Sequence, residues 1–542
     1  MTKRATTFLL FLSISLYSQE LSLDFFKDKP RSLAKDFYIS QYLKQDIKQQ
    51  DARELLGEVN NLNWALFYKF ADKLQDFSFS RVKYCKKLKP SLYLGKSNDC
   101  IAMGLSEYKS TKLDSKTLLK ISKLVKTNYP KLAKRYEIIA SNSFDTLIKN
   151  DAKTIIKTFT SVGGAYRREH FNHQFPAPIL SKLLKEKSFS LMVKKIVRDR
   201  KLNNLHNTLL KVDSSKISAE ANFLLGLNAL LLNKEDISIW YFKLSEDKAY
   251  TAFDKSKAIF WQYLLTKDPI LLDKLVNTKD INLYSLYAYE TLGLEPEGII
   301  TTLNPTKDTP PFDITDPFAW IKLKKMFKAK KYSSYEEKKN LALKFNSKLT
   351  EPHVCSLMYS FNQNKHYFLM PYFQYLKDYD KQRVALILAL ARQESKFIPT
   401  SVSYSYALGM MQFMPYVAKG IAKQSKFKNF QYSDMFKPEV AYKFANIHLN
   451  YLEKSLYHPL FIAYAYNGGL GFVKRKILQK DYFKDGKYEP FLSMEMMPNQ
   501  QARHYGKKVL ANYTIYSKLL GVDAPIKTLL KTLNPSNRTH RF

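Results

Sequence analysis

The sequence predicts an all-α protein of several domains. The chain has 542 residues, enough for about two to four domains. Its 16 glycines are well below the roughly 38 that average usage predicts. Scarce glycine, together with abundant leucine, lysine and alanine, favours helices over a β-sandwich or a barrel.

Residues 19–300 predict an α-superhelical solenoid. Amphipathic stretches separated by short polar breaks follow one another through this region. Three of them predict helices at Ala219–Leu232, Ile237–Leu244 and Lys257–Leu265. The pattern resembles helical-repeat arrays without a strict period, and the usual role of such an array is scaffolding.

Turn residues then divide the chain. Proline and glycine concentrate at Glu295–Gly298, Asn304–Pro305 and Thr309–Asp313. Eight of the sixteen glycines fall at or after Gly409, which indicates tight turns of the kind that sites often use. We therefore expect three further parts: a helical linker domain over residues 301–366, a C-terminal α domain over 367–520 and a tail over 521–542.

The N-terminus predicts export. Lys3 and Arg4 precede an apolar run, Phe8–Leu16, of the length found in signal peptides and too short to span a bilayer. We expect a signal peptide over residues 1–18, with an uncleaved anchor as the alternative. No second span is evident, so the protein is expected to be peripheral to a membrane at most.

The net charge of +38 predicts a polyanionic partner. Nucleic acid, acidic lipid and an acidic cell-wall polymer all fit the charge. Export and the lack of nucleic-acid-binding motifs argue against DNA and RNA. No metal-ligand spacing and no phosphate-binding loop occurs, so no metal and no cofactor is expected. Cys85 and Cys100 can pair in an oxidising compartment, leaving Cys355 over, but three free thiols fit equally well.

Glu394 is the strongest single candidate for catalysis. It follows the apolar helical stretch Val384–Ala391 and precedes Pro399. A carboxylate at the end of a buried stripe loses solvation, so its pKa should rise toward the range of a general acid. No other acid occurs between Glu394 and Asp434. The alternative is an ordinary glutamate at a helix end, solvated or paired with Arg392 or Lys396.

Four segments of the last domain suit a sugar-binding groove. Gln412 offers a donor and an acceptor, Met411 and Met414 supply apolar wall, and aromatic residues provide flat faces with polar tips. Buried core and ordinary turns are the alternatives for each residue taken alone. The segments run as follows: Glu394, Ser395, Phe397 and Pro399; Ser403 and Ala407–Pro415; Ala463–Gly469 with Tyr466 and Asn467; and Ala502–Gly506 with Tyr505.

In their order and spacing, these segments resemble the soluble lytic transglycosylases of bacterial cell-wall turnover. The resemblance is good over residues 367–520. The rest of the chain resembles the family only in its architecture and in a few local sequence patterns. Three positions depart from the family: Tyr406, Ala441 and the pair Gln501–Ala502. The resemblance implies a lysozyme-like catalytic domain behind the superhelix, a periplasmic monomer, and peptidoglycan glycan strands as partner.

The resemblance also implies a mechanism with one acid. Glu394 would protonate the leaving oxygen of the β-1,4 bond between N-acetylmuramic acid and N-acetylglucosamine. It would then take the proton of the muramic C6 hydroxyl, giving a 1,6-anhydro end. Residues expected to bind substrate are Ser395, Ser403, Met411, Gln412, Met414, Tyr466, Asn467 and Tyr505.

Two alternatives belong to other functional classes. A goose-type muramidase would hydrolyse the same bond and would need a second carboxylate in the groove. A non-enzymatic helical scaffold would only bind peptidoglycan. The candidates for the second carboxylate are Asp434, Glu439, Glu453 and Glu495.

Overall fold

The computed structural model describes residues 21–212, 217–329, 334–361, 365–477 and 482–534. This part of the chain contains thirty α-helices, a few 3₁₀ turns and two two-residue strands, so the all-α prediction is confirmed. The predicted signal peptide and residues 535–542 of the predicted tail lie outside the described residues. Among the described helices, none is long and apolar enough to cross a membrane.

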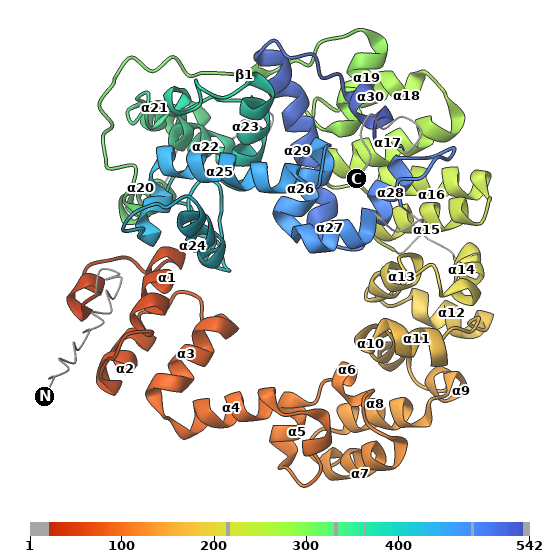
Figure 1. Ribbon diagram of the computed structural model, residues 1–542. Coiled ribbons are helices and arrows are strands. Elements are labelled where there is room, and N and C mark those ends of the chain that lie inside the picture. Colours follow the sequence, from red (N-terminus) through yellow and green to blue (C-terminus); the bar gives the residue numbers. More distant parts are fainter. Residues whose placement is uncertain (1–20, 213–216, 330–333, 362–364, 478–481, 535–542) are drawn as a thin grey trace, which may run out of the picture.

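The first nineteen helices follow one another along a curved array (Figure 1). The three helices predicted here correspond to α15, α16 and α17. The bounds are α1 Leu33–Tyr42, α2 Gln49–Gly57, α3 Trp64–Leu74, α4 Phe77–Lys87, α5 Asn98–Gly104, α6 Glu107–Ser110, α7 Ser115–Val125, α8 Pro130–Ser141, α9 Phe144–Ile148, α10 Ala152–Ser161, α11 Gly164–His170, α12 Ala177–Leu184, α13 Phe189–Val197, α14 Asn203–Thr208, α15 Ala219–Leu231, α16 Glu235–Asp247, α17 Ala252–Thr266, α18 Ile270–Val276 and α19 Leu283–Leu292.

Local chemistry explains how these helices start and pack. The Ser218 hydroxyl caps α15 by accepting the Ala221 N–H, and Asn282 caps α19 within a capping box. Gly226 lets α15 approach α16 closely, because a Cβ there would lie 2.5 Å from the Phe242 ring. A larger residue at Gly226 would force the two helices apart.

Cys85 and Cys100 form a disulfide between α4 and α5, and Cys355 is free and buried. Of the two states that the sequence left open for the first two cysteines, the structure has the paired one. The bond joins α4 to the short helix α5. A cross-link of this kind stabilises mainly by restricting the unfolded chain.

A short parallel strand pair accompanies the linking region and was not predicted. Strand β1 (Ile299–Ile300) pairs with β2 (His366–Tyr367), and helices α20 (Pro317–Ala329), α21 (Tyr335–Leu343) and α22 (Glu351–Phe361) lie between them in sequence. Two-residue strands give no alternating pattern that a sequence can reveal. The domain boundaries placed near residues 300 and 366 remain predictions.

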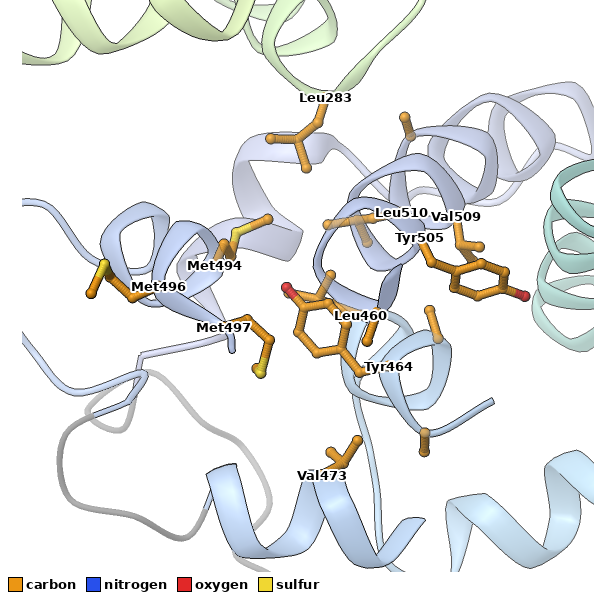
Figure 2. Packing of buried hydrophobic residues seen from close by; sticks show 14 of the residues in the cluster. Leu283, Leu460, Tyr464, Val473, Met494, Met496, Met497, Tyr505, Val509 and Leu510 are labelled. Carbon is orange, nitrogen blue, oxygen red and sulfur yellow. The ribbon is translucent and has the colours of Figure 1, made fainter. Parts of the chain in front are cut away.

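The C-terminal region packs around α29. Its helices are α23 Lys381–Ser395, α24 Pro415–Gln424, α25 Pro438–Glu453, α26 Pro459–Gly468, α27 Leu470–Ile477, α28 Phe491–Met496, α29 Gln500–Leu519 and α30 Ile526–Lys531. Gly506 allows α29 to meet α26, because a Cβ there would lie 2.2 Å from the Tyr464 ring. Figure 2 shows Tyr505 projecting from α29 on the side away from Met494, Met496 and Met497.

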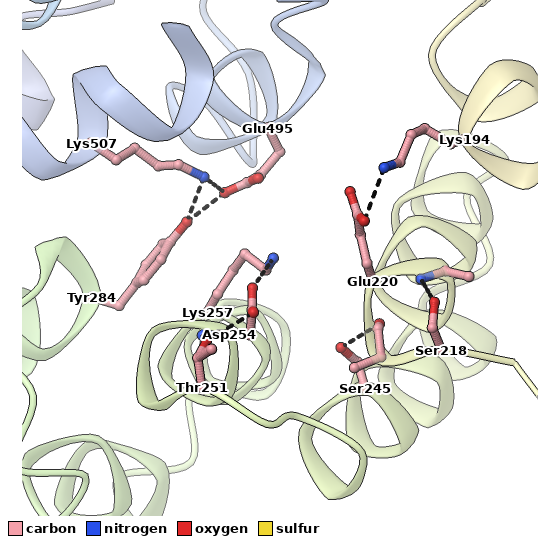
Figure 3. Close-up of polar contacts among 12 residues, drawn as sticks. Lys194, Ser218, Glu220, Ser245, Thr251, Asp254, Lys257, Tyr284, Glu495 and Lys507 are labelled. Atoms are coloured by element: carbon pink, nitrogen blue, oxygen red, sulfur yellow. Dashed lines mark hydrogen bonds and ion pairs between the residues drawn. The ribbon is translucent and has the colours of Figure 1, made fainter. Parts of the chain in front are cut away.

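Buried charges join the curved array to α29. Lys507 of α29 donates to Glu495 of α28 at 2.6 Å and to the Tyr284 hydroxyl of α19 at 3.1 Å (Figure 3). The Tyr284 hydroxyl donates to the same Glu495 carboxylate. Lys507 and Glu495 are 0% and 5% exposed. A buried ion pair of this kind fixes the relative position of its elements, because misplacing either charge leaves the other unpaired.

The array closes into a ring. Its N-terminal helices return to the C-terminal region beside α20 and α24 (Figure 1). The Phe37 ring packs against Tyr406 at 6.1 Å and Tyr432 at 5.9 Å, and the Asn63 side chain donates to the Tyr404 carbonyl at 2.9 Å. The sequence alone could not establish this closure, because each contact joins residues more than 300 positions apart.

Candidate active site

Glu394 lies at the end of α23, one residue before the helix stops. The stretch Val384–Ala391 before it is buried throughout. Lys396 and Phe397 then take left-handed backbone conformations, with φ of 56° and 64°, which end the helix. The helix therefore delivers Glu394 to the edge of the core, as the sequence predicts.

Burial and one hydrogen bond set the acidity of Glu394. The Tyr505 hydroxyl donates to Glu394 Oε1 at 2.7 Å. Burial raises the pKa of Glu394 to about 7, although the Tyr505 hydrogen bond works in the opposite direction. The predicted rise in pKa is confirmed. A substantial fraction of the carboxyl is therefore protonated at neutral pH, as a general acid requires.

The alternative of an ordinary ion-paired glutamate is wrong for this residue. Neither neighbouring cation forms a salt bridge with Glu394 within the described part of the chain. Arg392 donates to the Tyr367 carbonyl at 2.7 Å and to Asn512 Oδ1 at 2.6 Å. The Lys396 ammonium lies 3.2 Å from the centroid of the Tyr359 ring.

The loop after Glu394 is held by the polar side chains predicted to bind substrate. Ser395 Oγ donates to the Met410 carbonyl at 2.9 Å, and Ser403 Oγ accepts the Ala407 N–H at 2.9 Å. Gln412 Nε2 donates to the carbonyls of Ser401, at 3.0 Å, and Gly409, at 2.7 Å. The Gln412 amide nitrogen is thus engaged inside the loop, which leaves its oxygen as the group available to a ligand.

Gly409 explains why this loop can fold so tightly. Its φ is +75°, and a Cβ there would lie 2.0 Å from the Met435 carbonyl oxygen. Only glycine fits both conditions. The tight turns that the sequence indicates from Gly409 onward therefore include this one, where the backbone passes close to Met435.

The remaining predicted residues divide between core and surface. Met411 has 0% exposure, so the prediction that its side chain forms groove wall is wrong; the apolar side chain belongs to the core. Its carbonyl accepts the Tyr466 hydroxyl at 2.7 Å. Met414 and Tyr466 are half-buried, and Asn467 is exposed at the end of α26.

A cavity of about 1040 Å³ opens beside Glu394. The catalytic candidate and Ser395 line one side of it, together with Lys396 and residues of α29. Its other side comes from the curved array and the linking region. The cavity is therefore a shared site of segments distant in sequence, of a size that suits an extended ligand.

Several cavity residues could not be found from sequence. Tyr250 is 99% exposed at the approach to α17, and Lys508 extends from α29. His504 and Asp280 also line the space. His504 lies within the predicted segment Ala502–Gly506, whereas Tyr250, Asp280 and Lys508 belong to no local motif that points to binding. Their role depends on how the ring brings α17, α19 and α29 together.

The four carboxylates proposed for a muramidase serve other purposes or lie on the surface. Asp434 pairs with Lys437 at 2.9 Å, Glu453 pairs with Arg383, and Glu495 pairs with Lys507. Glu439 is exposed in the first turn of α25. Burial and Tyr505 are the two influences on the pKa of Glu394, and none of these four carboxylates is among them.

Comparisons with known proteins agree with this architecture. Residues 371–489 match the family model of the Transglycosylase SLT domain. A Haemophilus influenzae protein assigned as a soluble lytic murein transglycosylase is 31% identical over 134 residues, which are 24% of this chain and 22% of that protein. The match thus spans about a fifth of the relative's length.

Two solved structures are similar over most of the chain. The 70 kDa soluble lytic transglycosylase SLT70 from Escherichia coli has a TM-score of 0.52 at 17% identity, covering 94% of this chain and 88% of that chain. Lytic transglycosylase Slt from Pseudomonas aeruginosa has a TM-score of 0.43 at 15% identity, covering 91% and 88%.

The fold and the site together define a helical ring that carries a lysozyme-like α domain, which confirms the predicted architecture. Residues 371–489 match the transglycosylase SLT domain, and the fold of the chain is similar to that of the soluble lytic transglycosylase SLT70.

Proposed function

We propose that the protein is a lytic transglycosylase of peptidoglycan. It cleaves the β-1,4 bond between N-acetylmuramic acid and N-acetylglucosamine and leaves 1,6-anhydromuramic ends. The observation that carries the proposal is the state of Glu394. It is a carboxyl group with a pKa of about 7 that accepts a hydrogen bond from Tyr505 and lines a large cavity, and it lies within the residues that match the transglycosylase SLT domain.

One carboxyl group completes this reaction. Glu394 gives its proton to the glycosidic oxygen as the bond from that oxygen to muramic C1 breaks. The oxygen on C6 of the same sugar then bonds to C1, and its proton returns to Glu394. Water is not consumed, so the reaction does not need the second carboxylate that a hydrolysing glycosidase uses as base or nucleophile. The N-acetyl group of the substrate is placed to stabilise the charge at C1.

The surrounding residues have supporting roles in this proposal. Tyr505 orients the carboxyl group of Glu394 through its hydrogen bond. Ser395, Ser403 and Gln412 shape the loop beside the acid, and the Gln412 oxygen accepts from a substrate amide or hydroxyl. Tyr466, Asn467 and Met414, which do not line the cavity of Glu394, extend the binding surface beyond it.

The proposal includes a place of action and a partner. Export by the N-terminal segment brings the chain to the periplasm, where glycan strands are found and where Cys85 and Cys100 can stay oxidised. Peptidoglycan stems carry carboxylates, which a net charge of +38 attracts. The protein acts as a monomer without metal or cofactor, on the wall and not on nucleic acid.

Digestion of purified peptidoglycan tests the function. The wild-type protein should release soluble muropeptides, and Glu394→Gln should lower the rate by about 10³-fold, since the general acid is lost. Glu439→Gln is the matched control, because it removes the same group from an exposed position. Equal rates for wild type and Glu394→Gln would exclude Glu394 as the acid. No release by wild type would favour the scaffold alternative.

Two other carboxylates line the cavity of Glu394, and either could be the second carboxylate that a muramidase needs. Asp254 and Asp280 line the space with Glu394. Asp254 is already bound by Lys257 at 3.0 Å, which leaves Asp280 as the better second carboxylate. A hydrolase would lose most activity in Asp280→Asn, whereas the transglycosylase mechanism predicts a loss of less than about tenfold.

A further inference from the structure

A second cavity lies in the first part of the curved array. It has a volume of about 910 Å³ and is lined by residues from α3, α4, α5, α6, α8 and α10 and the turns between them. Helices α3, α6 and α10 lie on the inner side of the arc in Figure 1. None of the lining residues also lines the cavity of Glu394. The space is therefore a separate site on the same ring.

Aromatic rings form one wall of this cavity. Trp64 is 54% exposed, although it is among the most apolar of side chains. Tyr68 and Tyr129 lie in the same lining. The Lys86 ammonium lies 5.1 Å from the centroid of the Trp64 ring. An exposed indole with Tyr68 beside it, at 5.9 Å between ring centroids, offers the flat apolar face and polar rim against which sugar rings pack.

The charge of the lining is strongly positive. Its single carboxylate, Glu107, is neutralised by Arg135 at 2.6 Å. Lys86, Lys131 and Lys157 form no salt bridge with any described residue. Three positive charges therefore remain without a carboxylate partner around one space. They will bind an anion more readily than isolated surface lysines, since their fields add.

Two further features increase the positive potential. Lys109 adds a fourth ammonium group to the lining, where it donates to the Lys86 carbonyl at 2.8 Å. Helix α8, of 12 residues, begins at Pro130 in the lining, and the side chain of its N-cap residue Tyr129 does not cap the helix. The N-terminus of a helix carries partial positive charge.

We propose that this cavity is a second binding site for peptidoglycan, in which a sugar ring packs on Trp64 and stem-peptide carboxylates bind Lys86, Lys131 and Lys157. The identity of the polymer rests on the proposed function. The site holds a part of the polymer that does not react. Binding at two points on one ring raises the effective concentration of the strand at the catalytic cavity.

Fluorine NMR of Trp64 tests the site directly. The full chain with Glu394→Gln, which prevents turnover, is labelled with 5-fluorotryptophan, and Trp64→Phe assigns one of the four resonances. The probes are a soluble disaccharide-tetrapeptide muropeptide and neutral chitotetraose. Titration with the muropeptide should shift the Trp64 resonance until the site is saturated. Chitotetraose lacks carboxylates, so the apparent affinity read from the same resonance should be at least about threefold weaker. A silent Trp64 resonance, or an equal response to both probes, would overturn the proposal.

Charge removal gives a second measurement. Replacing Lys86, Lys131 and Lys157 by alanine should weaken the Trp64 response to muropeptide by about tenfold, from three lost ion pairs. The control is a second triple alanine variant, which removes the same number of positive charges from exposed positions outside the cavity: Lys185, Lys243 and Lys255. Equal loss of muropeptide affinity in both triple variants would show that only the net positive charge of the protein matters, and would overturn the assignment of these three lysines to the site. A silent Trp64 beside normal anhydro products would refute this site alone, whereas the absence of those products from wild type would refute the proposed function.

Discussion

Glu394 combines two properties that conflict in a folded protein. Its carboxyl group is buried enough to hold a proton near neutral pH, yet it lines an open cavity. Burial of an ionisable group costs stability whenever the group must ionise. A catalytic acid of this kind is therefore expected to destabilise the protein that carries it.

Replacing Glu394 by glutamine should stabilise the protein at alkaline pH. The folded pKa of about 7 lies above the ordinary value of 4.5, so stability is full below pH 4.5 and falls as pH rises toward 7. The glutamine side chain would not ionise and would still accept the Tyr505 hydrogen bond. Denaturant unfolding should show Glu394→Gln more stable by about 1–3 kcal/mol at pH 8 and equal at pH 4. A constant difference at both pH values would contradict the assigned pKa.

Removing the Tyr505 hydroxyl should shift the pH profile. Its hydrogen bond favours the ionised form of Glu394, so Tyr505→Phe should raise the pKa of Glu394. Activity falls at high pH as the acid loses its proton, and this fall should move to higher pH in the variant. Tyr466→Phe is the comparison, because that hydroxyl donates to the Met411 carbonyl instead. An unmoved alkaline limb in Tyr505→Phe would show that the bond does not tune the acid.

Sequence and structure agree at Glu394 because its setting is local. The apolar stretch, the helix stop and the tight loop at Gly409 are all encoded within about 30 residues. Met411 shows the limit of such reasoning. A methionine beside a tight glycine turn can face a groove or the core, and only the packing of neighbouring helices decides which.

At the scale of elements, α29 links the catalytic residue to the ring. One side of this helix carries Tyr505, which holds Glu394, and another carries Lys507, which binds Glu495 and Tyr284. Between them, Gly506 allows the helix to press against Tyr464. Three successive residues of one helix thus serve the acid, the core and the contact with the array.

Breaking the buried pair should be costly, whereas breaking an exposed pair on the same helix should not. Lys507→Ala leaves the buried Glu495 charge uncompensated and should lower the free energy of unfolding by about 3 kcal/mol or more. Lys518→Ala removes a pair with Glu295 whose side chains are 60% and 73% exposed, and should cost less than about 1 kcal/mol. Thermal and denaturant unfolding measure both. Similar losses in the two variants would show that the Lys507 pair has no special role.

Sequence motifs predicted α29 only in part. Arg503–Tyr505 belongs to the segment that carries the resemblance, but Lys507 and Glu495 have no motif of their own. Each is an ordinary charged residue until the fold buries it. Buried ion pairs between distant elements depend on tertiary packing, which local patterns do not encode.

At the scale of the whole molecule, closure of the ring depends on a few side chains from the N-terminal helices. Phe37 packs with the C-terminal region, whereas Phe26, Leu55, Leu66 and Phe70 form a small cluster of their own among α1 to α3. The N-terminal helices can therefore keep their own core while losing contact with Tyr406 and Tyr432. The superhelix itself was predictable from its run of amphipathic helices, but its curvature and closure were not.

Opening the ring should follow from Phe37→Ala. The substitution removes the ring contacts with Tyr406 and Tyr432, worth about 3–5 kcal/mol together with the cavity left behind. Small-angle scattering should show a larger radius of gyration while circular dichroism keeps its helical signal. Phe70→Ala is the comparison, because it weakens the core of the N-terminal helices themselves. This variant should lose part of its helical circular dichroism signal, which Phe37→Ala should keep. An unchanged radius in Phe37→Ala would mean that other contacts hold the ring.

The central claim is that Glu394 cleaves the glycan without water, and isotope labelling tests it most directly. Purified peptidoglycan is digested in water enriched in heavy oxygen, and the new muropeptide ends are analysed by mass spectrometry. The account predicts ends that are lighter than hydrolysed ends by one water and that carry no heavy oxygen. Hydrated reducing ends containing heavy oxygen would contradict it and would identify the protein as a muramidase.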